Sequence, residues 1–161
     1  MNVGLWLSNN AIGWSNLTRA EKIAIRDFPV LWALFEHSAT AKDANVGSIV
    51  AAVNGLASNP EAVTFTEALS YYQDRYYQGG HETQPYFNSL RLGAAWLPYV
   101  KPVFDGQVVD ARGSLIALLL IIHRLRNNYL HGEKADYGFA GQLDNFRHAN
   151  RCLMAAIPFW L

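Results

Sequence analysis

The sequence predicts an all-α fold: a helical bundle, in one domain over residues 1–161, with a long central helix. Apolar residues make up 51% of the 161 residues and charged residues only 16%, so the chain can bury a sizeable core and is not intrinsically disordered. Apolar side chains recur at steps of three and four in several segments, as they do on one face of a helix. No segment alternates apolar and polar residues clearly, so we predict no β-strands.

The first well-defined helix follows Thr18. Thr18 and Glu21 have the Thr-x-x-Glu spacing of a capping box, in which each side chain bonds to the backbone N–H of the other residue. Pro29 lies inside this segment and predicts a kink or a division into two helices, because proline removes a backbone donor and crowds the preceding turn. The apolar stripe of the segment consists of Ala24, Phe28, Leu31, Trp32 and Phe35.

Two further helices are predicted before residue 80. Asp43 is a candidate N-cap for a helix that ends near residue 57. Residues 59–61, Asn-Pro-Glu, have the pattern of an N-cap, a first-turn proline and a first-turn acid, and predict a third helix to about residue 77. Gly79 and Gly80 end that helix. Residues 81–106 contain scattered prolines and aromatic residues, so we expect loops and short helical turns there.

The strongest helical pattern covers residues 109–130 and predicts the central helix. Residues 115–122 form the longest uninterrupted apolar run, so this helix is expected to be buried on all sides. Gly132 lies where a glycine commonly ends a helix. A final helix is predicted over about residues 139–157, with a packed side made of Leu143, Phe146, Leu153, Met154 and Ile157.

Composition and charge exclude several classes of function. Thirteen Lys and Arg residues balance 13 Asp and Glu residues, which excludes a broadly basic nucleic-acid coat and leaves a local site as the only way to bind nucleic acid. Cys152 is the single cysteine, so we expect no internal disulfide, no cysteine-based zinc site and a reducing, cytoplasmic location. Residues 1–7 lack the pattern of a signal peptide. The apolar run of eight residues is far shorter than the ~18 needed to span a bilayer, so no membrane partner is expected.

A cluster of polar side chains follows the apolar run directly, over residues 123–134. On a helix, Asn127 and His131 lie one turn apart on the same face, and Arg124 lies one turn earlier. Arg126 lies about 140° round the helix from His131, but its side chain is long enough to reach the same ligand. The central helix therefore delivers several polar groups to its own C-terminal end, where they can meet around one ligand.

These residue types suit the cleavage of RNA without a metal ion. A helix C-terminus favours the protonated imidazole, and a histidine that titrates near neutral pH can act as acid or base. Arginine forms paired hydrogen bonds with phosphate oxygens, and asparagine can orient the imidazole. In such a reaction the ribose 2′-hydroxyl attacks the adjacent phosphorus, and the developing charge must be neutralised. The alternative is structural, since Arg, Asn, His and Gly are also common in the last turn of a helix.

The same residues resemble the signature of the HEPN superfamily. Residues 126–131, Arg-Asn-Asn-Tyr-Leu-His, match its Arg-x4-His motif, including the polar residue that often follows the arginine. The wider string 126–134 is similar to the Arg-Asn-Asn…His-Gly-x-Lys version found in a branch of small bacterial and plasmid-borne members. Residues 31–36, Leu-Trp-Ala-Leu-Phe-Glu, also resemble the early Leu-Trp-x-x-Phe helix of that branch.

The resemblance implies a HEPN-like helical domain that dimerises, so that two Arg-x4-His motifs face one cleft. Many members are metal-independent ribonucleases of toxin–antitoxin, abortive-infection or anti-phage systems, and others are inactive modules that bind RNA or protein partners. It implies that His131 is the acid or base, Arg126 the clamp on the phosphate and Asn127 its polar support. The expected partners are an RNA substrate, a second copy of the chain and an antitoxin or defence-system protein, with no cofactor and no metal ion.

We also predict that Arg124, Asn128 and Lys134 contact the substrate. Glu133 stands where toxins controlled by a nucleotidyltransferase antitoxin carry a tyrosine, so control through that tyrosine is not expected. The favoured function is a metal-independent endoribonuclease. Two alternatives stay open: a catalytically inactive HEPN-like module that binds RNA or protein, and a helical interaction domain in which the polar cluster only caps a helix.

Other candidate residues are assigned structural roles. His81 and Glu82 lack the second histidine of a metalloprotease helix. Cys152 is expected to be a small buried residue, and Asp144 and Arg147 are expected to form a surface ion pair. Surface, core-edge or packing roles are also expected for the other histidines and the tyrosine pairs, namely His37, His123, His148, Tyr71, Tyr72, Tyr76 and Tyr77.

Overall fold

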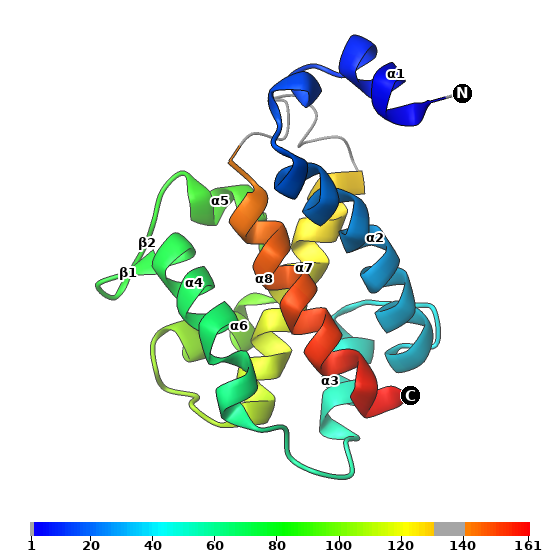
Figure 1. Cartoon of the computed structure of the whole chain (residues 1–161). Coiled ribbons are helices and arrows are strands. Elements are labelled where there is room, and N and C mark those ends of the chain that lie inside the picture. Colours follow the sequence, from blue (N-terminus) through cyan, green and yellow to red (C-terminus); the bar gives the residue numbers. More distant parts are fainter. Residues whose placement is uncertain (1, 131–140) are drawn as a thin grey trace.

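The computed structural model describes residues 2–130 and 141–161, which form a predominantly helical bundle (Figure 1), and this confirms the predicted all-α class. α-helices are labelled α, 3₁₀ helices η and strands β. In chain order the elements are α1 (Val3–Asn10), η1 (Trp14–Asn16), α2 (Arg19–Ala39), α3 (Val46–Asn54), η2 (Ala62–Phe65), α4 (Thr66–Tyr76), β1 (Tyr77–Gln78), β2 (His81–Glu82), α5 (Tyr86–Leu90), α6 (Leu97–Phe104), α7 (Ala111–Leu130), α8 (Leu143–Ala156) and η3 (Ile157–Trp160).

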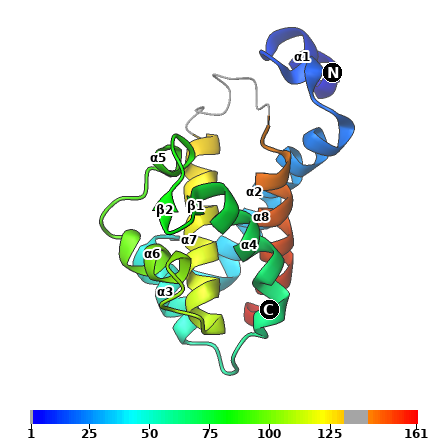
Figure 2. The ribbon, with the colours of Figure 1, turned by 90° about the vertical axis from the view of Figure 1, so that its left-hand side faces the viewer.

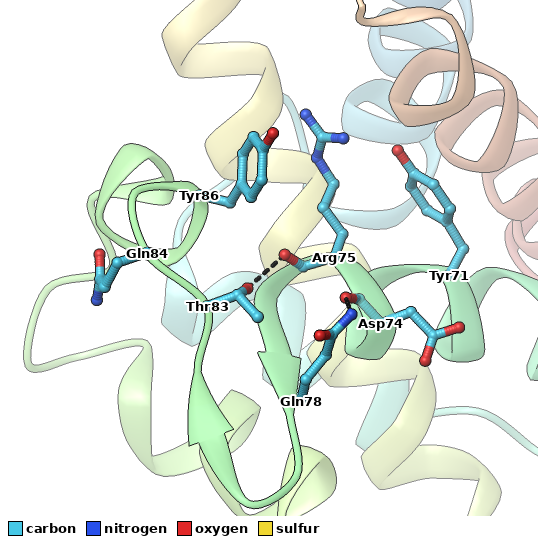
Figure 3. Close-up of a pocket in the computed structure, with 7 residues that line it drawn as sticks. All are labelled: Tyr71, Asp74, Arg75, Gln78, Thr83, Gln84 and Tyr86. Carbon is cyan, nitrogen blue, oxygen red and sulfur yellow. Dashed lines mark hydrogen bonds between the residues drawn. The ribbon is translucent and has the colours of Figure 1, made fainter.

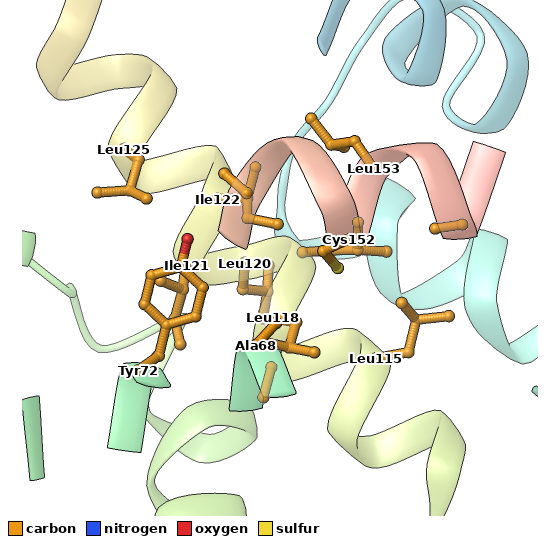
Figure 4. Packing of buried hydrophobic residues seen from close by; sticks show 14 of the residues in the cluster. Ala68, Tyr72, Leu115, Leu118, Leu120, Ile121, Ile122, Leu125, Cys152 and Leu153 are labelled. Carbon is orange, nitrogen blue, oxygen red and sulfur yellow. The ribbon is translucent and has the colours of Figure 1, made fainter. Parts of the chain in front are cut away.

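Helix α7 is the centre of the bundle, and the other long helices pack around it (Figures 1 and 2). α3 and α6 pack against α7, whereas α2 and α4 both pack against α8. Every residue of the run 115–122 is buried, as predicted for a helix that is apolar all round. Figure 4 shows side chains of α4, α7 and α8, among them Tyr72, Leu118 and Leu153, gathered in this core. No helix within the described ranges is both long and apolar enough to cross a membrane.

Helix α2 begins with the predicted capping box. The Thr18 hydroxyl accepts a hydrogen bond from the Glu21 backbone N–H at 3.2 Å, and the Glu21 carboxylate accepts one from the Thr18 N–H at 2.8 Å. Pro29 does not divide the helix, which continues unbroken to Ala39. An internal proline costs about 3 kcal/mol. The apolar residues on either side of it are buried in the core, and their packing outweighs that cost; they are Ala24, Ile25, Phe28, Trp32 and Phe35.

The next two helices begin later than predicted. Asn45, not Asp43, is the N-cap of α3: its side-chain oxygen accepts from the Ser48 N–H at 3.0 Å, and the Ser48 hydroxyl accepts from the Asn45 N–H at 2.9 Å. The helix ends at Asn54 instead of near residue 57, with Gly55 as its C-cap. Pro60 is buried but belongs to no helix, and the chain passes through η2 before α4 begins at Thr66.

A short hairpin replaces the simple loop predicted after α4. Strands β1 and β2 pair antiparallel, which corrects the prediction that the chain has no strands. Gly79 and Gly80 form the turn with φ values of 59° and 83°, in the left-handed region that glycine adopts without strain. α4 ends at Tyr76, with Tyr77 as its C-cap, so the glycine pair does not end the helix as predicted but builds the turn of the hairpin. The short helices α5 and α6 follow, in agreement with the helical turns predicted for residues 81–106.

Helix α8 agrees with the predicted final helix in its buried face but not at every position. Phe146 and Leu153 are buried as predicted, whereas Met154 is 55% exposed. Each residue advances about 100° round a helix, so Met154 lies beside the face that Leu153 occupies. The predicted start of this helix at residue 139 and the predicted terminal Gly132 lie outside the described residues.

Candidate active site

The last two turns of α7 carry the polar cluster singled out by the sequence. The structure places its members on two sides of the helix. Arg126 contacts α2, whereas Arg124 and Asn128 contact the end of α5. His131 and Lys134, which the sequence analysis assigns to catalysis and substrate binding, lie outside the described residues.

Arg126 and Asn127 are joined by a hydrogen bond, as expected for a clamp and its polar support. The guanidinium Nη1 donates to the Asn127 side-chain oxygen at 3.0 Å. Among the described residues the nearest carboxylate is that of Glu36 in α2, with 3.9 Å between Arg126 Nη2 and Glu36 Oε2. Arg126 Nε is buried and has no acceptor within residues 2–130 and 141–161. The guanidinium is therefore held in place but only weakly neutralised.

Arg126 lies at a small cleft between α2 and α7. The cleft has a volume of about 170 Å³. Sites that enclose a whole small molecule measure roughly 300–1,000 Å³, so this cleft is of a size for a phosphate group and not for a nucleotide. Its lining consists of Phe28, Pro29, Trp32, Ala33 and Glu36 from α2 and of Arg126, Tyr129 and Leu130 from α7.

His123 supports the other side of Asn127. The Asn127 amide nitrogen lies 3.4 Å from His123 Nε2, one helical turn earlier. The imidazole is buried and stacks on Trp32, with ring centres 5.5 Å apart, and on Trp96 at 6.3 Å. Burial lowers the pKa of His123 to about 4, and the positive charges of Arg126 and Arg124 add to the effect. His123 is therefore neutral at neutral pH and orients Asn127 instead of exchanging protons.

Arg124 and Asn128 hold α5 against the central helix. Arg124 Nε donates to the Leu90 carbonyl at 2.9 Å, and its guanidinium lies over the Trp96 ring at 5.3 Å. Asn128 is buried, and its amide nitrogen donates to the Ser89 carbonyl at 2.8 Å. Arg124 and Asn127 lie three residues apart on the intact helix, but the Arg124 side chain reaches α5, whereas Asn127 contacts Arg126 and His123. The part of Arg124 and Asn128 in substrate binding stays a prediction, beside the structural contacts that they make.

The sequence analysis missed Glu36 and His123 as parts of this site. Glu36 is 90 residues from Arg126 in the sequence, and no local pattern links the two. The His123–Asn127 pair had a signal, because residues four apart on a helix lie on one face.

The remaining candidates have the structural roles expected of them. Asp144 and Arg147 form an ion pair at 3.6 Å, and Tyr72 and Tyr76 are buried in the core. Cys152 is buried, and burial raises the pKa of its thiol to about 12, which is unsuited to a nucleophile. In the part of the chain that the structure describes, no three His, Cys, Asp or Glu residues are grouped to hold a metal ion.

Comparisons with protein-family models, with curated protein sequences and with solved structures find no match for this chain. The functional argument therefore rests on the geometry at the end of α7 and on the residue pattern of the cluster.

Proposed function

We propose that this chain is a metal-independent endoribonuclease of the HEPN type that acts as a homodimer. The geometry of Arg126 carries the proposal. Its guanidinium is fixed by Asn127 at 3.0 Å, stands at a cleft of phosphate size and lies 3.9 Å from the Glu36 carboxylate. Within residues 2–130 and 141–161 this guanidinium has no hydrogen-bond acceptor other than Asn127, so donors on its two terminal nitrogens are available to phosphate oxygens, whereas the Nε donor is buried. The resemblance of residues 126–134 to the HEPN motif supports the same conclusion.

The size of the cleft supports the dimer. A volume of about 170 Å³ fits a phosphate but leaves the neighbouring ribose and base without a wall. A second copy that faces this end of α7 completes the site and brings a second motif to it. The resemblance further suggests a cytoplasmic toxin or anti-phage effector, held in check by an antitoxin or another defence protein.

In the proposed reaction, a base removes the proton from the ribose 2′-hydroxyl, and the oxygen attacks the adjacent phosphorus. The bond from phosphorus to the 5′-oxygen breaks, and an acid protonates that oxygen. Arg126 neutralises the charge that develops on the phosphate oxygens. With a pKa of about 4 and a buried ring, His123 cannot act as the acid at neutral pH. We assign base and acid to the two copies of His131.

Cleavage of RNA in the presence of EDTA tests this function. We expect products with 2′,3′-cyclic phosphate and 5′-hydroxyl ends, because the attacking group is the ribose 2′-hydroxyl. Activity that disappears with EDTA and returns with Mg²⁺ would contradict the mechanism. Light scattering over a dilution series tests the dimer, and a monomer at tens of micromolar would contradict the composite site.

RNA binding measured in the same samples separates the enzyme from an inactive module. Binding without cleavage, abolished by Arg126→Gln but not by Arg147→Gln, would indicate an RNA-binding protein that uses the same clamp. Arg147 is a suitable control because it is an exposed arginine with an ion pair of its own.

A further inference from the structure

A second pocket lies between α4, the hairpin and α5, and it shares no residue with the cleft at Arg126 (Figure 3). Its volume is about 430 Å³, which is within the range of small-molecule sites. The proposed ribonuclease mechanism uses none of its lining. Arg75 and Tyr71 come from α4, Thr83 follows β2, and Tyr86 begins α5.

Arg75 is the cation of this pocket. Its guanidinium carbon lies 4.8 Å from the centre of the Tyr86 ring and 5.8 Å from that of Tyr76. Figure 3 shows the guanidinium extending between the rings of Tyr86 and Tyr71, whereas the Asp74 carboxylate points away from it. Within residues 2–130 and 141–161 no carboxylate pairs with Arg75, and its Nε is buried without an acceptor.

A count of hydrogen-bond donors shows which groups remain for a ligand. The Tyr71 hydroxyl donates its proton to the Asn145 side-chain oxygen at 3.0 Å, and the Thr83 hydroxyl donates its proton to the Arg75 carbonyl. Each hydroxyl has one proton, so neither can donate to a ligand as well. The Arg75 guanidinium hydrogen-bonds to the side chains of Tyr71 and Tyr76, and the rest of its five N–H donors remain for a ligand. The Tyr86 hydroxyl also remains, and the amides of Gln78 and Gln84 each keep a second N–H beside the one that donates to Asp74 or Asn88. Tyr86 is 49% exposed, so part of its side chain remains accessible beside Arg75.

The positive charge of Arg75 is permanent. Burial acts to lower the pKa of this guanidinium, but Tyr76, Tyr71 and Tyr86 together raise it above its ordinary value. In the described part of the chain this half-buried cation pairs with no carboxylate, although Asp74 also lines the pocket, and its field attracts an anion.

We propose that this pocket binds a terminal phosphate monoester attached to a nucleoside. The planar fork of Arg75 matches two phosphate oxygens, and the Tyr86 hydroxyl is placed to donate to the same group. A volume of about 430 Å³ exceeds what a phosphate alone requires, and the exposed part of the Tyr86 side chain offers an aromatic surface against which a base can pack. The phosphate can come from a free mononucleotide or from the 5′ end of an RNA strand.

Isothermal titration calorimetry of the full chain tests the proposal with 5′-AMP and with adenosine as the probes. We expect 5′-AMP to bind with a Kd below about 1 mM and adenosine to bind at least about tenfold more weakly. A 5′-phosphorylated oligoribonucleotide and its 5′-hydroxyl counterpart then identify the source. In a His131→Ala background, where the strand is not cleaved, tighter binding of the phosphorylated strand than of both its 5′-hydroxyl counterpart and 5′-AMP indicates an RNA end. Tighter binding of 5′-AMP, with no difference between the two strands, indicates a free nucleotide.

Variants assign the binding to the pocket. Arg75→Gln should weaken 5′-AMP about ten- to hundredfold. Arg75→Lys should also weaken it, because an ammonium lacks the fork. Tyr86→Phe removes one oxygen and leaves the ring, so it tests the pocket even if the Arg75 variants fold poorly. Arg151→Gln is the matched control, since this exposed arginine pairs with Glu67 outside the pocket.

Equal affinity for 5′-AMP and adenosine would overturn the proposal. So would an affinity left unchanged by both Arg75→Gln and Tyr86→Phe, or no saturable heat at about 5 mM 5′-AMP. The two proposals can be refuted independently, because the proposed RNA cleavage depends on Arg126 and His131 and the proposed binding of 5′-AMP does not.

Discussion

Replacing His123 with phenylalanine is expected to remove much of the protein's acid sensitivity. The imidazole is 6% exposed and stacks on Trp32 and Trp96, next to the positive charges of Arg124 and Arg126. Burial, with those two charges adding to it, lowers the pKa of His123 from 6.5 to about 4. The unfolded chain therefore binds this proton more readily than the folded protein does, so His123 makes the protein less stable as the pH falls from about 6.5 to about 4.

The size of this pH effect on stability follows from the shift in the pKa of His123. Each pKa unit corresponds to about 1.4 kcal/mol. At about pH 5, roughly 1.5 units below the unfolded pKa of 6.5, the unfolded chain has bound this proton and the folded protein has not. The free energy of unfolding is therefore about 2 kcal/mol lower at pH 5 than at pH 7. Phenylalanine fits between the same two rings and loses only the 3.4 Å contact with Asn127, at a cost of about 1 kcal/mol or less at pH 7.

Urea unfolding of both proteins at about pH 7 and about pH 5 measures this effect. The wild type should lose about 2 kcal/mol more than His123→Phe over that interval. Other groups that titrate, including His148, are present in both proteins and cancel in the comparison. Parallel losses in the two proteins would refute the conclusion that His123 is held neutral in the core.

Three further predictions concern groups on other elements. Arg112→Ala should lower the free energy of unfolding by about 2–3 kcal/mol, because the Arg112 guanidinium donates to four backbone carbonyls within residues 53–58 and to the Asn59 side chain. If urea unfolding shows a loss no larger than that of the control Arg147→Ala, this prediction is contradicted. Asn145→Ala should lower the free energy of unfolding by about 1–3 kcal/mol, since the buried Tyr76 hydroxyl loses its acceptor. Adding Tyr76→Phe should recover part of that stability, and a double variant that recovers none would count against this explanation. Glu36→Gln removes the carboxylate nearest Arg126 and should raise RNA affinity about two- to fivefold in fluorescence anisotropy, whereas a lower affinity would show that Glu36 is needed to position Arg126.

The central helix was predictable because its signal is local. Eight consecutive apolar residues, 115–122, require burial on every side, whatever the neighbours are. The capping box of Thr18 and Glu21 was predictable for the same reason. The effect of Pro29 was not, because the helix is held together by packing between α2 and distant parts of the chain, which outweighs a local preference.

The candidate site was predictable in part. The spacing placed Asn127 one turn before His131 and left Arg126 to reach the same ligand through its long side chain. The structure joins Arg126 to Asn127 with a hydrogen bond. The partners of Arg124 and Asn128 were not predictable, because they are carbonyls of α5. That helix lies in a segment without a periodic pattern, so the sequence gives no sign of which side of α7 it covers.

RNA cleavage by His131→Ala and Arg126→Ala, measured beside their melting temperatures, tests the central claim most directly. Loss of a proton-transfer group should slow cleavage about 10²–10⁴-fold in His131→Ala, while RNA binding is retained. Arg126→Ala should weaken both cleavage and binding. Its partly exposed contact with Glu36 at 3.9 Å contributes at most about 1 kcal/mol, so its melting temperature should stay close to that of the wild type. A His131→Ala protein that melts several degrees lower and cleaves RNA as fast as the wild type would show that the cluster caps a helix and catalyses nothing.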